Sequence, residues 1–218
     1  MPKANIIHLT ATPTHSADLA DFLTLGGSLV ERGEPATLRW YALSREGDGA
    51  QQAIFGVFPD QAGRQAHFDG EVAAALAARA GELVEGGWPG VLAQVSNMIA
   101  LAEHRSADQR TARKANFIRL QARPGKAAAL REFLIAGGDL VAQTDPQTLY
   151  WAALESEDRH DEFAIFDLFT DQAGREAHFS GVVAAALADR AEELIIGGWQ
   201  GVLAEVVHFD VHTGMSRN

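Results

Sequence analysis

Two histidines lie in two nearly identical nine-residue segments of the chain. The segments read DQAGRQAHF at residues 60–68 and DQAGREAHF at residues 171–179, with His67 and His178 at the eighth position. An imidazole can accept or release a proton near neutral pH, so each histidine is a candidate general base. A structural histidine that bonds a helix carbonyl is the competing interpretation.

An arginine precedes each histidine by three positions. On a helix this spacing places Arg64 and Arg175 on roughly the same face as the histidines, where a guanidinium could stabilise an oxyanion or a peroxide. The acids four residues earlier, Asp60 and Asp171, offer these arginines an ordinary ion pair instead.

Aromatic and amide side chains recur at matching positions in both halves of the chain. Trp40 and Trp151 could sandwich a flat ligand, although core packing explains them as well. Asn5 and Asn116 lie on a predicted strand with their amides toward the interior, where they could orient a ligand oxygen or make a strand-end hydrogen bond. The candidate ligand-contacting residues are Trp40, Trp151, Asn5, Asn116, Phe68 and Phe179.

These matching positions follow from a duplication. A shift of 111 residues aligns Asn5 with Asn116 without a gap, and about 51 of roughly 91 aligned pairs are identical. A unit of about 100 residues can hold its own core, whereas solenoid repeats are usually shorter. We therefore expect one domain at residues 1–101, a linker at 102–115 and a second domain at 116–218.

Two positions differ between the repeats where chemistry could differ. Gly56 aligns with Asp167, and Tyr41 aligns with Ala152. If only one repeat is active, Asp167 together with His178 favours the second, because a carboxylate beside an imidazole is a candidate functional pair.

Each repeat predicts the element order β-α-β-β-α-β, which is the ferredoxin-like arrangement. Proline ends the first strand, and a Gly-Gly pair inside the first helix indicates a break or a close approach. A second Gly-Gly pair predicts a left-handed stop after the second helix. The expected strands are 5–12, 37–43, 53–58 and 91–99 in repeat 1, and 117–123, 148–154, 163–169 and 202–212 in repeat 2. The expected second helices are 60–83 and 171–194, with Asp60 and Asp171 at their N-cap positions.

The hairpin strands are apolar on both faces. In repeat 2, Leu149 and Trp151 share one face while Tyr150 and Ala152 share the other. A half-exposed sheet would alternate with polar residues, so we expect a cover on each face. Helices provide one cover, and two sheets packed face to face would provide the other.

With these features the chain resembles the antibiotic biosynthesis monooxygenase (ABM) domains of the dimeric α/β barrel superfamily. The matching features are a first strand that runs into a Pro-Gly turn (IRLQARPGK, residues 118–126), the hairpin, and a helix carrying Ala-His-Phe. The resemblance covers nearly all of both repeats. It implies an α+β fold in which the two halves form an intrachain barrel, with a ligand pocket between helices and sheet near the histidines.

The resemblance also provides a test for haem. The haem-degrading members carry an Asn in the first strand, a Trp early in the second helix and a His about ten residues later. Those positions here hold Ile7, His67 and Ala77 in repeat 1, and Ile118, His178 and Ala188 in repeat 2. Haem degradation is therefore disfavoured.

Composition limits the partners. A formal charge of −11 argues against nucleic acid and anionic membranes, because both require clustered Lys and Arg. The chain has no cysteine, no signal-peptide pattern at its start, and no apolar run of about 20 residues. No metal-ligand spacing falls on a predicted helix. We expect a cytoplasmic protein without a metal or cofactor, a pseudo-dimer within one chain that could pair further.

Two functions remain open. The first is a cofactor-independent monooxygenase, which deprotonates a hydroxylated aromatic, quinol or polyketide-like molecule so that its anion reacts with O₂; the resemblance implies this activity. The second is a non-catalytic small-molecule binding or stress-response protein with the same barrel. Fold alone does not choose between them.

Overall fold

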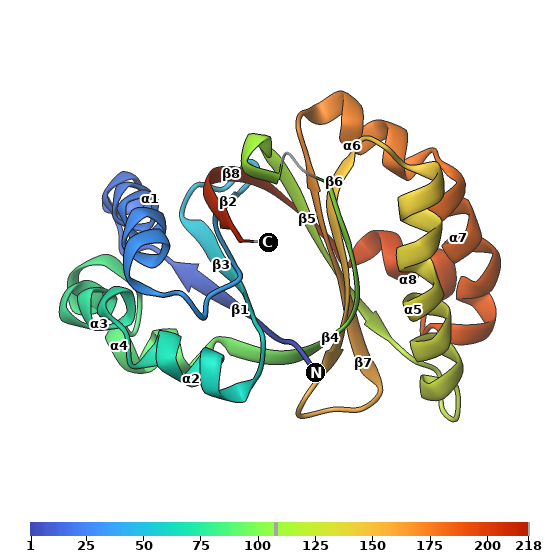
Figure 1. Ribbon diagram of the computed structural model, residues 1–218, viewed down its shortest axis with the longest axis horizontal. Helices are drawn as coiled ribbons and strands as arrows, with labels where there is room; N and C mark the ends of the chain where they lie inside the picture. The colour runs from blue at the N-terminus through green and yellow to red at the C-terminus, as the bar shows by residue number, and fades with distance from the viewer. Residues whose placement is uncertain (107–108, 218) are drawn as a thin grey trace. The chain divides into compact units, whose positions relative to one another are not determined.

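A computed structural model describes residues 1–106 and 109–217, and it divides into two compact units. Unit 1 comprises Met1–Asn97 and Phe209–Asn218, and unit 2 comprises Met98–His208. Each unit therefore contains most of one repeat and the end of the last strand of the other. Figure 1 follows the chain through both units.

The elements occur in the same order in the two repeats. In repeat 1 they are β1 (Lys3–Thr10), α1 (Ser16–Gly33), β2 (Arg39–Arg45), β3 (Gln51–Phe58), α2 (Gln61–Phe68), α3 (Glu71–Leu83), α4 (Gly87–Ala93) and β4 (Val95–Arg105). After a short 3₁₀ turn (η1, Gln109–Thr111), repeat 2 has β5 (Lys114–Gln121), α5 (Ala127–Thr144), β6 (Thr148–Ser156), β7 (Glu162–Phe169), α6 (Gln172–Phe179), α7 (Val182–Leu194), α8 (Gly198–Ala204) and β8 (Val206–Ser216).

Every strand pair with an assigned register is antiparallel. In unit 1, β3 lies between β1 and β2, and the Phe209–Ser216 part of β8 pairs with β2. In unit 2, β7 lies between β5 and β6, and the Met98–Arg105 part of β4 pairs with β6. The strand order β1-β3-β2-β8-β5-β7-β6-β4 closes as a barrel. The predicted α+β fold with an intrachain barrel is confirmed.

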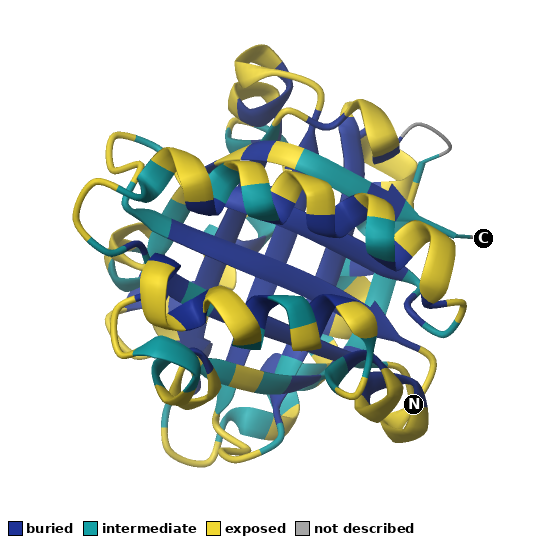
Figure 2. Cartoon of the chain, turned by 90° about the vertical axis from the view of Figure 1, so that its left-hand side faces the viewer, coloured by how far each residue is buried: buried dark blue, intermediate teal, exposed yellow. Residues whose placement is uncertain are grey.

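Helices cover one face of each sheet. In unit 2, α5 and α7 lie side by side on the sheet, and in unit 1 α1 and α3 do the same (Figure 1). Beneath them are two apolar clusters that contain Trp40 in unit 1 and Trp151 in unit 2. Figure 2 shows dark blue strands behind the helices of unit 1, whose outward faces are yellow.

Strand residues of both faces are buried, as the apolar pattern predicts. In β6, Trp151 and Ala153 belong to the cluster under the helices, while Tyr150, Ala152 and Leu154 on the opposite face are fully inaccessible.

The first helices run unbroken through their Gly-Gly pairs, which serve close packing. A Cβ on Gly137 would lie 3.0 Å from Cη2 of Trp151, and a Cβ on Gly26 would lie 3.4 Å from Cη2 of Trp40. Of the two predicted explanations, close approach is therefore the one that the structure supports.

The predicted second helix is wrong in one respect, because it is two helices. It breaks at Gly70 and Gly181, the extended N-cap residues of α3 and α7. A Cβ on Gly70 would lie 2.8 Å from Oε1 of Glu34, so the break lets this carboxylate approach α2. The predicted caps at Asp60 and Asp171 are confirmed, since each accepts a hydrogen bond from the backbone of the third residue onward.

The last strands begin later than predicted. Gly86 and Gly197 have the left-handed conformation expected of a stop, but the short helices α4 and α8 follow them, so residues 91–93 and 202–204 are helical. Residues 102–105 of the expected linker lie in β4, and two positions of that linker, 107 and 108, lie outside the described residues. No helix in the described ranges is long and apolar enough to cross a membrane.

Candidate functional site

His178 lies between two carboxylates in unit 2. Its Nδ1 is 2.5 Å from Oδ2 of Asp145, the residue that caps the end of α5, and 3.2 Å from Oγ1 of Thr148. Its Nε2 is 3.8 Å from Oδ2 of Asp167 on β7. Since all four side chains are buried or nearly so, their charges interact with little screening by water.

The surroundings shift the pKa values of Asp167, His178 and Asp145. Burial raises the pKa of Asp167 to about 6, although His178, Asn116 and Arg175 oppose the rise. Burial lowers the pKa of His178, but the Asp145 hydrogen bond and the charges of Asp167 and Asp145 outweigh it, and the net change is upward. For Asp145, burial raises the pKa, but its hydrogen bonds to His178 and Thr148 lower it by a larger amount, so the net change is downward. The imidazolium form of His178 is favoured, with a carboxylate at each ring nitrogen.

Asn116 and His208 extend this polar group toward solvent. Asn116 lies directly opposite Asp167 in the β5–β7 register, and its Nδ2 donates to Oδ2 of Asp167 at 3.5 Å. Nδ1 of His208 on β8 is 2.8 Å from Oδ1 of Asn116. Asp167 and Asn116 are fully inaccessible, whereas His208 is exposed.

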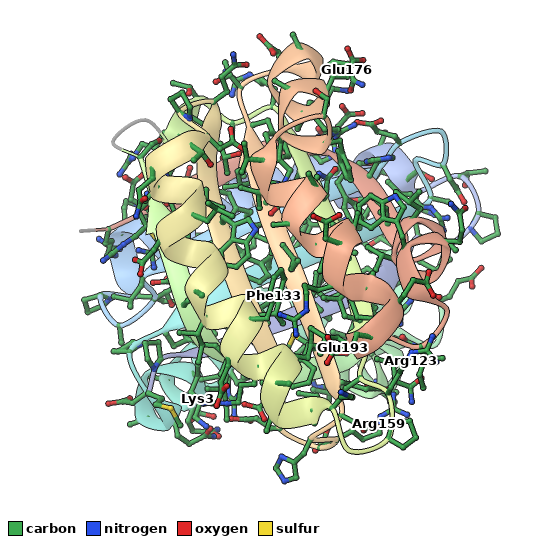
Figure 3. The ribbon with its side chains drawn as sticks, turned by 90° about the vertical axis from the view of Figure 1, so that its right-hand side faces the viewer. Lys3, Arg123, Phe133, Arg159, Glu176 and Glu193 are labelled. Carbon is green, nitrogen blue, oxygen red and sulfur yellow. The ribbon has the colours of Figure 1, made fainter. Side chains whose placement is uncertain are left out.

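An apolar cavity of about 100 Å³ lies between α5, α7 and the sheet of unit 2. Its mouth is between the helices, where Figure 3 shows Phe133, and Trp151 and Ile165 line its inner part. Its lining is Phe133, Leu134, Ala136, Gly137, Leu140, Trp151, Ile165, Val183, Ala186 and Leu187.

Asp167 is not part of the cavity lining, but it lies on the same sheet face as the lining residues Trp151 and Ile165. It lies two residues beyond Ile165 on β7 and directly opposite Trp151 on β6. One carboxylate oxygen of Asp167, Oδ1, and the indole N–H of Trp151 have no hydrogen-bond partner within the described part of the chain. Trp151, which carries the unsatisfied indole N–H, thus lines the cavity, and Asp167, which carries the unsatisfied carboxylate oxygen, lies directly opposite it in the sheet.

Repeat 1 retains part of the site. Nδ1 of His67 is 2.5 Å from Oε2 of Glu34, and the Thr37 hydroxyl donates to the same oxygen. Gly56 stands in place of Asp167, and a Cβ there would lie 2.9 Å from both Oδ1 of Asn5 and Cζ of Phe58. Repeat 1 thus has the acid–histidine pair without the second carboxylate.

The remaining predicted residues have structural contacts. Arg64 and Arg175 join their helices to the first strands by donating to the carbonyls of Ala4 and Ala115. Phe68 and Phe179 pack edge-on against the neighbouring histidines, with ring centroids 5.8 and 5.9 Å apart. Trp40 is buried in the unit 1 cluster, and Asn5 is buried opposite Gly56.

Sequence reasoning missed Glu34, Asp145, Thr148 and His208. A signal for the first two was present, because position 34 and its counterpart 145 both carry an acid just before a shared proline. Within the described residues, no three His, Asp or Glu side chains are grouped to hold a metal ion.

No family model and no curated protein sequence matches the chain. Solved structures do match. A protein provisionally named a monooxygenase from Fusobacterium nucleatum subsp. nucleatum ATCC 25586 has a TM-score of 0.84 at 12% identity, with 100% of this chain and 95% of that chain covered. An anthrone oxidase-like protein has a TM-score of 0.60 at 12% identity, with 99% and 92% covered.

A third match has a similar fold. An uncharacterised ferredoxin-fold protein from Listeria monocytogenes 4b F2365, related to antibiotic biosynthesis monooxygenases, has a TM-score of 0.53 at 7% identity, with 97% and 95% covered. This chain has the ABM-type fold. The resemblance drawn from the sequence is thereby confirmed for the fold, and at these identities any activity of the chain has to be argued from its site.

Proposed function

We propose that repeat 2 is a cofactor-independent oxygenase site for a hydroxylated aromatic compound of one ring, with Asp167 as the base. The observation that carries the proposal is the buried Asp167, whose unpartnered oxygen lies on the same sheet face as the apolar cavity. The names of the fold relatives, which include monooxygenases and an anthrone oxidase-like protein, support this class of reaction.

The choice of base differs from the expectation that His178 would serve. Both ring nitrogens of His178 face carboxylates, and its raised pKa favours the protonated form, which cannot accept a proton. Asp167 has a pKa of about 6, close to the range in which a general base works best at neutral pH. In this proposal His178 holds Asp167 and stabilises its charge.

The chemistry needs no further reagent than O₂. Asp167 takes the hydroxyl proton of a quinol, and the anion gives one electron to O₂. The two radicals then join as a peroxide anion at a ring carbon, and Asp167 returns the proton to it to form the hydroperoxide. Cleavage of the O–O bond with loss of water leaves a carbonyl at that carbon. A hydroquinone plus O₂ thus gives a hydroxyquinone plus water, one oxygen atom entering each product.

The cavity limits the substrate to small rings. A dry cavity of about 150 Å³ can hold benzene, so a cavity of about 100 Å³ accommodates at most one ring without movement of α5 or α7. Ala136 is the one lining residue that differs from its counterpart in repeat 1, which is Leu25. A larger residue at 136 should therefore obstruct the mouth.

Oxygen uptake by the purified protein, measured with a panel of hydroquinones and anthrones, tests the proposal. We expect turnover of one-ring quinols, with ¹⁸O from ¹⁸O₂ in the product and a kcat/KM that rises with pH through about 6. Asp167→Asn should lower kcat/KM about 100-fold or more, because that is the usual contribution of a general base.

Two further variants locate the site. Ala136→Leu should raise KM, and His67→Gln in repeat 1 should leave turnover unchanged. Full uptake by Asp167→Asn would remove Asp167 as the base. If quinols bind to the cavity, as NMR titration would reveal, but none is turned over, the protein is the binding module considered as the alternative.

A further inference from the structure

Five polar side chains of unit 2 form one continuous series. It runs from Asp145 through His178 and Asp167 to Asn116 and His208, with successive contacts of 2.5, 3.8, 3.5 and 2.8 Å. Only His208, at the end of the series, is exposed. The buried carboxylate of Asp167 is thus joined to a titratable group at the surface through one amide.

The Asn116 amide has a defined direction. An ionised Asp167 can only accept, so the Nδ2 of Asn116 faces it and donates. The Oδ1 of Asn116 then faces His208, so the Nδ1 of His208 carries a hydrogen and donates to it. Reversal of the amide would require an acceptor nitrogen at His208 and a protonated Asp167.

Packing fixes the ring of His208 in this position. Phe179 lies edge-on to it, with the ring centroids 6.1 Å apart, and the same phenyl ring lies edge-on to His178. Phe179 therefore contacts the histidine at each side of the Asp167–Asn116 pair.

Two of the three positions Asn116, Asp167 and His208 differ in repeat 1. Asn97 and Gly56 replace His208 and Asp167, and only Asn5 is kept. Both amide atoms of Asn5 are buried without a hydrogen-bond partner in the described chain, and so is Oδ1 of Asn97. Where the carboxylate is absent, the histidine that would orient the amide is absent too.

We propose that His208 is a positioning residue of the repeat 2 site, which acts through Asn116 to hold Asp167 in its ionised form. The role in turnover rests on the proposed function, but the coupling itself does not. His178, Asp145 and Arg175 are the other charged groups that act on Asp167, and they are left in place when His208 is changed.

A titration of the full-length protein, free of any substrate, tests the coupling. The probe is the ¹³C signal of the Asp167 side-chain carboxyl, assigned by its loss in Asp167→Asn. His208→Leu removes the donor, so the pKa of Asp167 should rise by about 0.5 to 1, less than a full charged hydrogen bond because the Asn116 contact is long. His208→Gln offers an amide N–H and should restore most of the original value.

The matched control is His212→Leu, which removes a histidine four residues further along β8. We expect no change in the pKa of Asp167 in that variant. In the unaltered protein, the ¹⁵N shifts of the His208 ring should also move as Asp167 titrates, and Asp167→Asn should abolish that movement.

Equal pKa values of Asp167 in the unaltered protein and in His208→Leu would overturn the proposal, and so would an equal rise in His212→Leu. If the pKa of Asp167 follows His208 but no quinol is oxidised, the positioning role stands and the oxygenase proposal fails. The two proposals therefore fail separately.

Discussion

The carboxylate of Asp167 has no counterpart in repeat 1, where Gly56 stands in its place. His67 and His178 both hold an acid at Nδ1, but only His178 has a second acid beyond Nε2. Gly56 has no room for that side chain, because Asn5 and Phe58 already lie within 3 Å of where its Cβ would be. Repeat 1 therefore lacks both the second acid and the space for its side chain.

Burial of Asp167 should destabilise the protein at neutral pH. Its pKa is raised by folding, so the stability it contributes is complete below about pH 4 and is lost as the pH rises through about 6. Asp167→Asn should therefore raise the free energy of unfolding at pH 8, by about 3 kcal/mol at most, and leave it unchanged at pH 4.

Urea denaturation at the two pH values measures this difference. Asp189→Asn, at an exposed position on α7, is the matched control and should show no such dependence. A loss of stability in Asp167→Asn at pH 8 would mean that its charge contacts outweigh its burial, contrary to the raised pKa.

At the scale of single residues, the sequence predicted part of the candidate site. The repeat offset located His178, Asp167 and Asn116, because differences and identities between the copies are visible without a structure. His208 could not be found in this way, because its contact with Asn116 joins residues 92 positions apart. Such a contact depends on strand register, which the apolar pattern of a two-sided sheet leaves undetermined.

At the scale of elements, the glycine pairs of α1 and α5 admit the tryptophans of the sheet. Gly137 contacts the ring of Trp151 and also lines the cavity, so the same residue sets the packing of α5 and the space beside it. Gly81, by contrast, is exposed on α3 with nothing within 4 Å of a would-be Cβ.

Alanine at these two glycines should therefore have opposite effects. Gly81→Ala should raise the free energy of unfolding by about 0.5 to 1 kcal/mol, the ordinary helix gain. Gly137→Ala should lower it, because the new methyl group meets a ring held between helix and sheet. Thermal and urea unfolding would measure both; equal stabilisation by the two changes would contradict the packing role of Gly137.

The sequence predicted the order of elements better than their ends. The caps at Asp60 and Asp171 were found because an acid before a helix has a local function. The breaks at Gly70 and Gly181 were not found, because the apolar spacing continues across them. At Gly70 a residue of another element also lies at the break, since Oε1 of Glu34 is 2.8 Å from where a Cβ would be.

At the scale of the whole molecule, the last strand of each repeat completes the other repeat's sheet. The end of β8 pairs with β2, and the end of β4 pairs with β6. A repeat expressed by itself would leave the edge of β2 or β6 unpaired, and unpaired edges promote association.

We therefore expect residues 1–105 by themselves to self-associate or aggregate, while the full chain keeps these edges paired. Sedimentation velocity over a range of concentrations would distinguish the two. A stable monomer of residues 1–105 with cooperative unfolding would show that the strand exchange is dispensable.

The covalent link between the repeats also affects what a single substitution changes. In a dimer of identical chains, every substitution appears twice, so a buried acid such as Asp167 would burden both halves with its destabilisation. A single gene that encodes both halves can acquire the acid in one and keep glycine in the other. Fusion therefore allows the two halves to differ, so that one half carries the buried acid while the other is spared its destabilisation.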